Sequence, residues 1–207
     1  MIKPYYQDSH VTIYNCDCEE ILPDLPKVDL VLTDPPYGLK RFKQGVKKND
    51  RLVNKATATF NNNVPNSGLL LEIISKGEFA IIWGMNNLIL PQTEYFLVWD
   101  KMQTVDNFAS AELAWTNIKV PAKIFHHSIH KHNAIKNNGH PTEKSLLLFS
   151  WCISLAKVSD TIIDPYMGSG TTLRAAKDLN KKAMGIEIEE KYCEIAANRL
   201  CQEVLEL

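Results

Sequence analysis

The sequence lacks several features that would place it in a large class of proteins. No apolar run approaches the length of a membrane span, and the first ten residues contain no apolar core of signal-peptide length. The five cysteines are an odd number at no disulfide-like spacing, which predicts free thiols in a reducing compartment. The formal net charge of −1 provides no overall field that favours polyanions or membranes. We therefore expect a cytoplasmic protein without membrane contact.

Metal-binding patterns are also scarce. Cys16 and Cys18 form a C-x-C pair, but no matching second pair follows. Four histidines lie within residues 126–132, without a cysteine or carboxylate partner nearby in the sequence. We therefore expect no metal site.

Positive charge is concentrated in one segment. Between Lys40 and Lys55, seven basic residues accompany the single acidic residue Asp50, for a local net charge of +6. The surrounding residues have little periodicity, so we interpret residues 39–66 as a basic mobile arm. One side of the protein can then meet a polyanion although the whole chain is nearly neutral. A solvated surface loop is the alternative.

Predicted strands alternate with predicted helices along the chain. The strands are residues 11–14, 28–33, 79–83, 95–99, 112–116, 161–163 and 183–186. The helices are residues 18–22 (a weak turn closed by Pro23), 68–76, 142–156 (with a threonine start), 171–179 and 189–205. This order predicts one α/β domain over residues 1–207 with an open, mostly parallel sheet, in which strand 112–116 pairs with the segment after it. Such sheets bind ligands beyond the carboxyl ends of their strands.

Two loop motifs follow predicted strands. The first is Asp34-Pro35-Pro36-Tyr37-Gly38, after the apolar run that ends at Thr33. The second is a glycine loop that reads Asp164-Pro165-Tyr166-Met167-Gly168-Ser169-Gly170-Thr171-Thr172. Its glycines allow a tight turn and close approach to a ligand, and its threonines offer helix capping. The next strand ends at Glu187, which is placed to accept hydrogen bonds from ribose hydroxyls.

The charge of the glycine loop favours one kind of nucleoside ligand. The third glycine of the dinucleotide fingerprint is missing, because Leu173 occupies that position. Asp164 and Glu187 make the walls anionic, which suits a cofactor with a nucleoside and a cationic centre better than a pyrophosphate. The alternatives are a structural strand–turn–helix corner and an NAD-dependent oxidoreductase, which would leave Asp-Pro-Pro-Tyr without a role.

Three blocks of the sequence together resemble the beta-class amino DNA methyltransferases of the adenine-N6 type. They are the Asp-Pro-Pro-Tyr motif, His140-Pro-Thr-Glu-Lys-Ser145, and the glycine loop followed by Gly185-Ile-Glu187 and Tyr192. The resemblance implies a Rossmann-like sheet, mostly parallel with an antiparallel edge hairpin, in a circularly permuted motif order. It also implies S-adenosylmethionine as cofactor, double-stranded DNA as substrate and a short target-recognition segment at about 119–138. The sequence does not determine whether the protein forms a homodimer or has a partner restriction nuclease.

The resemblance assigns catalysis to the first motif, with Asp34, Pro35, Pro36 and Tyr37 as its residues. Asp34 and the Pro35 carbonyl would accept hydrogen bonds from the exocyclic amine of a flipped adenine and localise its lone pair. Tyr37 would stack on the base, and Gly38 would leave room for it. A rigid proline-terminated loop with a capping aspartate is the alternative.

The resemblance also implies cofactor and DNA contacts. The cofactor residues are Asp17, Thr142, Lys144, Asp164, Pro165, Tyr166, Gly168, Ser169, Gly170, Thr171 and Glu187. Asp17, assigned to the adenine of the cofactor, is equally placed to cap a helix; Lys144, assigned to the methionine end, is otherwise a solvated helix lysine. The DNA contacts are Lys40, Arg41, Lys43, Lys47, Lys48, His130 and Lys131, with the histidine segment read as a DNA-facing loop.

The leading function is therefore adenine-N6 methylation of DNA, because serine replaces the leading aspartate more often in cytosine-N4 relatives. Cytosine-N4 methylation is the first alternative. RNA and protein-glutamine methyltransferases use a related motif that is usually led by asparagine and placed after the cofactor loop. Both features differ from this sequence and argue against those activities. The intact Asp34, Gly168, Gly170 and Glu187 argue against a DNA-binding module with a disabled active site.

Overall fold

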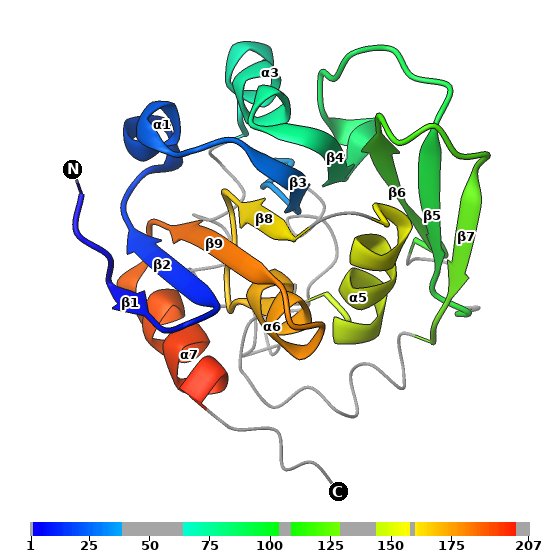
Figure 1. Ribbon diagram of the computed structural model, residues 1–207. Coiled ribbons are helices and arrows are strands. Elements are labelled where there is room, and N and C mark those ends of the chain that lie inside the picture. The colour runs from blue at the N-terminus through cyan, green and yellow to red at the C-terminus, as the bar shows by residue number, and fades with distance from the viewer. Residues whose placement is uncertain (1, 39–63, 104–108, 129–143, 158–159, 202–207) are drawn as a thin grey trace, which may run out of the picture.

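The computed structural model describes residues 2–38, 64–103, 109–128, 144–157 and 160–201 (Figure 1). Within these ranges nine strands form one sheet, in the order β1-β2-β9-β8-β3-β4-β6-β5-β7. The strands are β1 (Tyr6–Gln7), β2 (Val11–Asn15), β3 (Val28–Thr33), β4 (Gly77–Trp83), β5 (Phe96–Asp100), β6 (Ala111–Thr116), β7 (Lys123–His126), β8 (Thr161–Asp164) and β9 (Lys182–Glu187). The α-helices are α1 (Cys18–Ile21), α3 (Ser67–Ser75), α5 (Leu146–Leu155), α6 (Thr171–Asp178) and α7 (Glu190–Cys201).

The predicted mostly parallel sheet is confirmed. Strands β2, β9, β8, β3 and β4 run parallel to one another. Beyond β4, strand β6 is antiparallel to both β4 and β5, and β7 adds outside β5 in parallel. The antiparallel hairpin, which was expected at an edge, is formed by β5 and β6 and lies one strand in from the edge. At the other edge β1 pairs antiparallel with β2.

Two parts of the strand prediction were wrong or incomplete. Strand β6 pairs with β4 and β5, which precede it, and not with the segment after it. The edge strands β1 and β7 were not predicted, because each is short and carries little apolar alternation. Strand β7 also occupies part of the predicted target-recognition segment, whose residues 129–138 lie outside the described ranges.

Helices cover both faces of the sheet. Figure 1 shows α1 and α3 on one face, and α5, α6 and α7 on the other. Side chains alternate accordingly: in β4, Ile81 and Trp83 join the cluster under α5, whereas Ala80 and Ile82 join the cluster under α3. Burial on both faces explains why β3 and β4 read as nearly continuous apolar runs.

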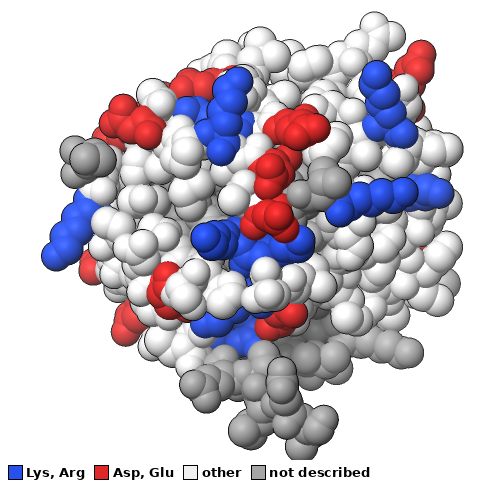
Figure 2. Space-filling model, viewed as in Figure 1, with Lys and Arg blue, Asp and Glu red and all other residues white. Residues whose placement is uncertain are grey.

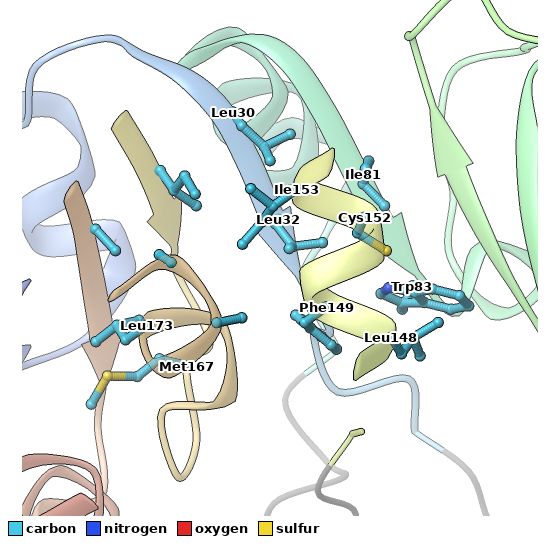
Figure 3. Packing of buried hydrophobic residues seen from close by; sticks show 14 of the residues in the cluster. Leu30, Leu32, Ile81, Trp83, Leu148, Phe149, Cys152, Ile153, Met167 and Leu173 are labelled. Carbon is cyan, nitrogen blue, oxygen red and sulfur yellow. The ribbon is translucent and has the colours of Figure 1, made fainter. Parts of the chain in front are cut away.

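Helix α5 closes the core next to the centre of the sheet. Its residues Leu148, Phe149, Cys152 and Ile153 are buried and belong to the same cluster as Leu30, Leu32, Ile81 and Trp83 (Figure 3). The helix was predicted to begin at residue 142, but it begins at Leu146, and Ser145 is its N-cap without a side-chain cap hydrogen bond. Lys144 therefore precedes the helix.

Helix α1 ends at Ile21, with Leu22 as its C-cap just before Pro23, and the 3₁₀ helix η1 (Leu22–Asp24), which contains Pro23, follows it directly. Most of the predicted basic arm, residues 39–63, lies outside the described ranges, as do residues 202–207 at the end of the last predicted helix. Among the described helices, none combines the length and the apolar character that a bilayer span requires.

We expect Ile81→Ala to lower the free energy of unfolding by about 2–5 kcal/mol, because Ile81 is fully buried between β4 and the helices on that face. Leu71→Ala is the matched control: Leu71 lies on α3 and is 53% exposed, so we expect a change within about 0.5 kcal/mol. Urea denaturation followed by circular dichroism measures both. Equal losses in the two variants would contradict the assigned core.

Candidate active site

The ends of three neighbouring parallel strands place both sequence motifs at one edge of the sheet. Strand β8 lies between β3 and β9, and all three end on the same side. Asp34 follows β3, Asp164 ends β8 and Glu187 ends β9. The Thr33 hydroxyl donates a hydrogen bond to Asp164 Oδ1 over 2.7 Å, which joins the first motif to the second.

Asp34 lies in a network of charges around the buried ammonium of Lys144, in which the other members are partly exposed. Its carboxylate accepts hydrogen bonds from the Lys144 ammonium and the Tyr37 hydroxyl. Lys144 Nζ also lies 3.2 Å from Glu112 Oε2 and 3.2 Å from the Tyr37 hydroxyl oxygen. The other Glu112 oxygen pairs with Lys101. Charges therefore alternate along the line Lys101, Glu112, Lys144 and Asp34.

Burial and pairing set the ionisation of this network. Burial raises the pKa of Asp34, and the charge of Lys144 opposes that rise. Burial would also raise the pKa of Glu112, but the ammonium groups of Lys144 and Lys101 hold it at about 2. Burial would lower the pKa of Lys144, yet Asp34 and Glu112 raise it well above its usual range. Lys144 is therefore charged at neutral pH.

Tyr37 is held against the turn that follows β4. Gly84 has φ +81°, and a Cβ atom placed there would collide with the Tyr37 ring. The Gly84 amide donates to the Leu113 carbonyl over 2.8 Å, so this turn is fixed to β6. A side chain at position 84 is therefore excluded by both the backbone conformation and the ring of Tyr37.

The glycine loop has the tight turns that the sequence predicted. Gly168 and Gly170 have φ values of 51° and 79°. The amides of Gly168 and Glu189 donate to the two carboxylate oxygens of Glu187, over 3.1 and 2.8 Å. A Cβ atom on Gly170 would lie 2.8 Å from the Cβ of Ala196 in α7. The loop is therefore packed closely between Glu187 and α7.

Asp164 faces inward from the loop. Its oxygens accept hydrogen bonds from the Thr33 hydroxyl, the Tyr166 amide and the Thr172 hydroxyl. The predicted capping by threonine was wrong, because Gly170 is the N-cap of α6 and makes no side-chain cap hydrogen bond. Thr172 instead donates to Asp164, and the Thr171 hydroxyl accepts from Arg199 over 3.2 Å.

The remaining predicted cofactor residues lie in different surroundings. Pro165 and Ser169 are buried within the glycine loop, and Tyr166 is half-buried beside them. Asp17 is exposed and caps α1 by accepting from the Glu19 amide over 3.0 Å, which agrees with the helix-cap alternative. Lys144, only 7% exposed, is not a solvated helix lysine; its ammonium contacts Asp34 and Glu112.

Several predicted contacts fall outside the described ranges. They are Thr142 and the DNA-contact candidates Lys40, Arg41, Lys43, Lys47, Lys48, His130 and Lys131. From the histidine segment, His126 is described, and its ring Nδ1 lies 2.9 Å from Asp100 Oδ2. Over the face in Figure 2, basic and acidic side chains of the described residues lie interspersed, in keeping with a net charge near zero.

Sequence reasoning missed Glu112 and Lys101. Glu112 lies inside the apolar strand β6, between Ala111 and Leu113, and such a lone charge was the available signal. Lys101 follows β5 directly, and its amide donates to the Ser110 carbonyl over 2.9 Å. The two side chains meet because β5 and β6 pair, and no local pattern records that register.

Comparisons with known proteins point to one family. A family model described as DNA methylase, covering N6 and N4 enzymes, matches residues 75–198, which is more than half of the chain. The Type II methyltransferase M.ScaI of Streptomyces caespitosus is 26% identical, over 99% of this chain and 86% of that protein. The Type II methyltransferase M.HinfI of Haemophilus influenzae is 27% identical, over 97% and 71%.

Solved structures agree with these relatives. The M1.HpyAVI–SAM complex is 26% identical, with a TM-score of 0.58 over 93% of this chain and all of that one. The cytosine-N4-specific PvuII DNA methyltransferase has a TM-score of 0.64 over 99% of this chain and 91% of that one. At 15% identity the second likeness concerns the fold alone.

We expect the stability of the protein to depend on pH through Glu187. Burial raises the pKa of this carboxyl to about 7, whereas its pKa in an unfolded chain is ~4.3. Protonated Glu187 therefore makes its full contribution to stability below the pKa that it has in the unfolded chain. This contribution is lost as the pH rises through the pKa that it has in the folded protein. The glutamine of Glu187→Gln cannot ionise. The free energy of unfolding of this variant should therefore rise by about 3 kcal/mol relative to that of the natural protein as the pH goes from 4 to 8.

Urea unfolding at a series of pH values measures this difference. The control is Glu20→Gln, which removes an exposed carboxylate from α1 and should follow the natural protein at every pH. Parallel curves for the natural protein and Glu187→Gln would show that burial does not hold a proton on Glu187.

Proposed function

The chain belongs to the DNA methylase family whose model matches residues 75–198, and on that premise we propose that it methylates the N6 amine of adenine in DNA. It is a DNA methyltransferase that uses S-adenosylmethionine. The observation that supports methyl transfer at this site is the hydrogen bond from Thr33 to Asp164, which joins the loop of Asp34 to the glycine loop. The choice of adenine rests on the aspartate that leads the first motif.

The residues around the glycine loop fit this cofactor. Gly168 and Gly170 adopt positive φ values that glycine accepts without strain, and the turn at Gly170 packs so closely on Ala196 that it leaves no room for a side chain. Glu187 brings a carboxylate to the tip of β9, where ribose hydroxyls are bound in sheets of this kind. We assign Pro165, Tyr166, Ser169 and Thr171 to the same loop site, and Asp17, Thr142 and Lys144 to its margins. When bound, S-adenosylmethionine supplies an electrophilic methyl group on a cationic sulfur.

Asp34 and Pro35 prepare the amine for attack. The exocyclic amine of adenine is a weak nucleophile because its lone pair is delocalised into the ring. Hydrogen bonds from its two N–H groups to the Asp34 carboxylate and the Pro35 carbonyl draw that pair onto nitrogen and stabilise the positive charge that develops. The amine then loses one proton, which Asp34 is placed to accept. Pro35 and Pro36 hold the carbonyl in place.

Tyr37 supports the base outside the duplex. A base within a duplex cannot reach the site, so it must be extruded, at a cost of a few kcal/mol. Stacking on an aromatic ring offsets roughly 1–3 kcal/mol of that cost. The contact of the Tyr37 ring with Gly84 keeps the ring in place for this role.

The basic residues of the arm are proposed to track the DNA backbone. Their contacts would be with phosphates and would weaken as the salt concentration rises. We assign recognition of the target to residues 119–138 and the arm, since β3, β4 and the glycine loop form the core and the site. Sequence specificity thus lies outside the catalytic scaffold of this single domain.

We expect Asp34→Asn to lower the rate of methyl transfer by at least about 100-fold, because an amide cannot stabilise the charge on the amine as a carboxylate does. Calorimetry should show S-adenosylmethionine affinity within a few-fold of the natural value, since Asp34 acts on the base. Asp24→Asn, an exposed residue of η1, is the control and should retain full activity. Loss of cofactor binding in Asp34→Asn would contradict this division of roles.

Mass spectrometry of nucleosides tests the target base. The protein is incubated with unmethylated DNA and S-adenosylmethionine, and the DNA is then digested. N6-methyladenine is the expected product, by virtue of the aspartate that leads the motif. If N4-methylcytosine is found instead, the target base is cytosine and the assigned roles of Asp34 and Pro35 still hold. If no methylated base is found, the proposed substrate is refuted.

A further inference from the structure

Lys144 contacts two carboxylates, that of Asp34 in the loop after β3 and that of Glu112 in β6. Its ammonium pairs with Asp34 Oδ2 and lies 3.2 Å from Glu112 Oε2. It is also 3.2 Å from the Tyr37 hydroxyl oxygen, and only 7% of the side chain is exposed. A buried ammonium keeps its charge only beside anionic partners, so Lys144 must stay within this group of residues.

The pairing of Lys144 with Asp34 conflicts with the role proposed for Asp34. Both carboxylate oxygens already accept hydrogen bonds, Oδ1 from Tyr37 and Oδ2 from Lys144. A carboxylate has further lone pairs, so the amine of a base can still reach it. However, an ammonium on the carboxylate neutralises the charge that would stabilise the developing cation on the amine. Asp34 therefore acts most strongly when Lys144 shifts away from it.

Glu112 offers Lys144 a second anionic partner at a short distance. It lies in β6, and its Oε1 is paired with Lys101, the residue after β5. Lys101 is fixed by its amide hydrogen bond to Ser110 and by the Trp99 ring, whose centroid lies 5.2 Å from Nζ. Glu112 is thus anchored on the sheet, while its Oε2 faces Lys144.

We propose that Glu112 is a positioning residue, which holds Lys144 when the target amine engages Asp34 and so leaves Asp34 its full charge for methyl transfer. This inference rests on the proposed function. It differs from a purely structural role, in which Glu112 would balance charge in the fold and leave the reaction unaffected.

The first test is the kinetics of Glu112→Gln, which keeps the shape of the side chain and removes its charge. We expect kcat to fall by about tenfold or more, while KM for S-adenosylmethionine stays within about twofold, because the change acts on the amine and not on cofactor binding. Glu112→Asp, which keeps the charge, should recover part of kcat. Glu94→Gln, an exposed carboxylate ahead of β5, is the matched control and should keep natural kinetics.

The second test is the pH dependence of kcat. Asp34 faces Lys144, Glu112 and Tyr37, and Asp164 lies close enough to be affected by its charge. Lys144 lowers and Glu112 raises the pKa of Asp34. The acid limb of the profile should therefore move to lower pH in Glu112→Gln and to higher pH in Lys144→Met. Both shifts follow from the charges of Glu112 and Lys144 and identify Asp34 as the group that titrates, while the fall in kcat and the double variant separate positioning from a structural role.

The third test is the double variant. If Glu112 acts through Lys144, removing Glu112 should cost little once Lys144 is methionine, so Lys144→Met with Glu112→Gln should be no slower than Lys144→Met alone. Thermal unfolding and calorimetric cofactor binding establish that each variant is folded.

The outcomes separate this inference from the proposed function. Natural kcat in Glu112→Gln would overturn the role of Glu112, as would a double variant that is slower than Lys144→Met by the full factor lost in Glu112→Gln. Both results leave the methyltransferase proposal standing. If the natural protein itself transfers no methyl group to any DNA base, the proposed function and the inference both fail.

Discussion

The buried ammonium of Lys144 is the interaction on which the arrangement of the site depends. Asp34 and Glu112 both lie against it, and without a cation between them two carboxylates would repel each other in a poorly hydrated space. The three groups come from the loop after β3, from β6 and from the residues before α5. The network therefore forms only when the sheet and α5 are in place, so the charge of Asp34 depends on tertiary structure as well as on its own loop.

Strand order explains why two motifs far apart in sequence act at one place. Because β8 lies between β3 and β9, the loops that follow these strands are neighbours at one edge of the sheet. Side chains then join adjacent strand ends: Thr33 donates to Asp164, and Gly168 donates to Glu187. Asp164 accepts hydrogen bonds from Thr33, Tyr166 and Thr172, and so holds the first motif against the glycine loop.

Local patterns predicted the parts of the molecule that local forces determine. The bounds of strand β3 and the turns at Gly168 and Gly170 were predicted, because a continuous apolar run and a Gly-x-Gly turn act over a few residues. The partners of Lys144 were not predicted, because they depend on the register of β6 against β4 and β5. The role of Thr172 was missed for a related reason: its hydroxyl is used by Asp164, eight residues earlier, once α6 packs on β8.

The charge balance of the site gives a physical reason for a cationic cofactor. The two motifs and the Lys144 network contain more carboxyl groups than ammonium groups among the described residues. The carboxyl groups are those of Asp34, Glu112, Asp164 and Glu187, and the ammonium groups are those of Lys101 and Lys144. Burial raises the pKa of Asp164 to about 6 and that of Glu187 to about 7, so these two carboxyls hold protons more tightly than exposed ones. A cation bound beside them favours their ionised forms and displaces those protons. A ligand that carries positive charge thus lowers the free-energy cost of burying ionised carboxylates at the strand ends. A pyrophosphate would increase that cost.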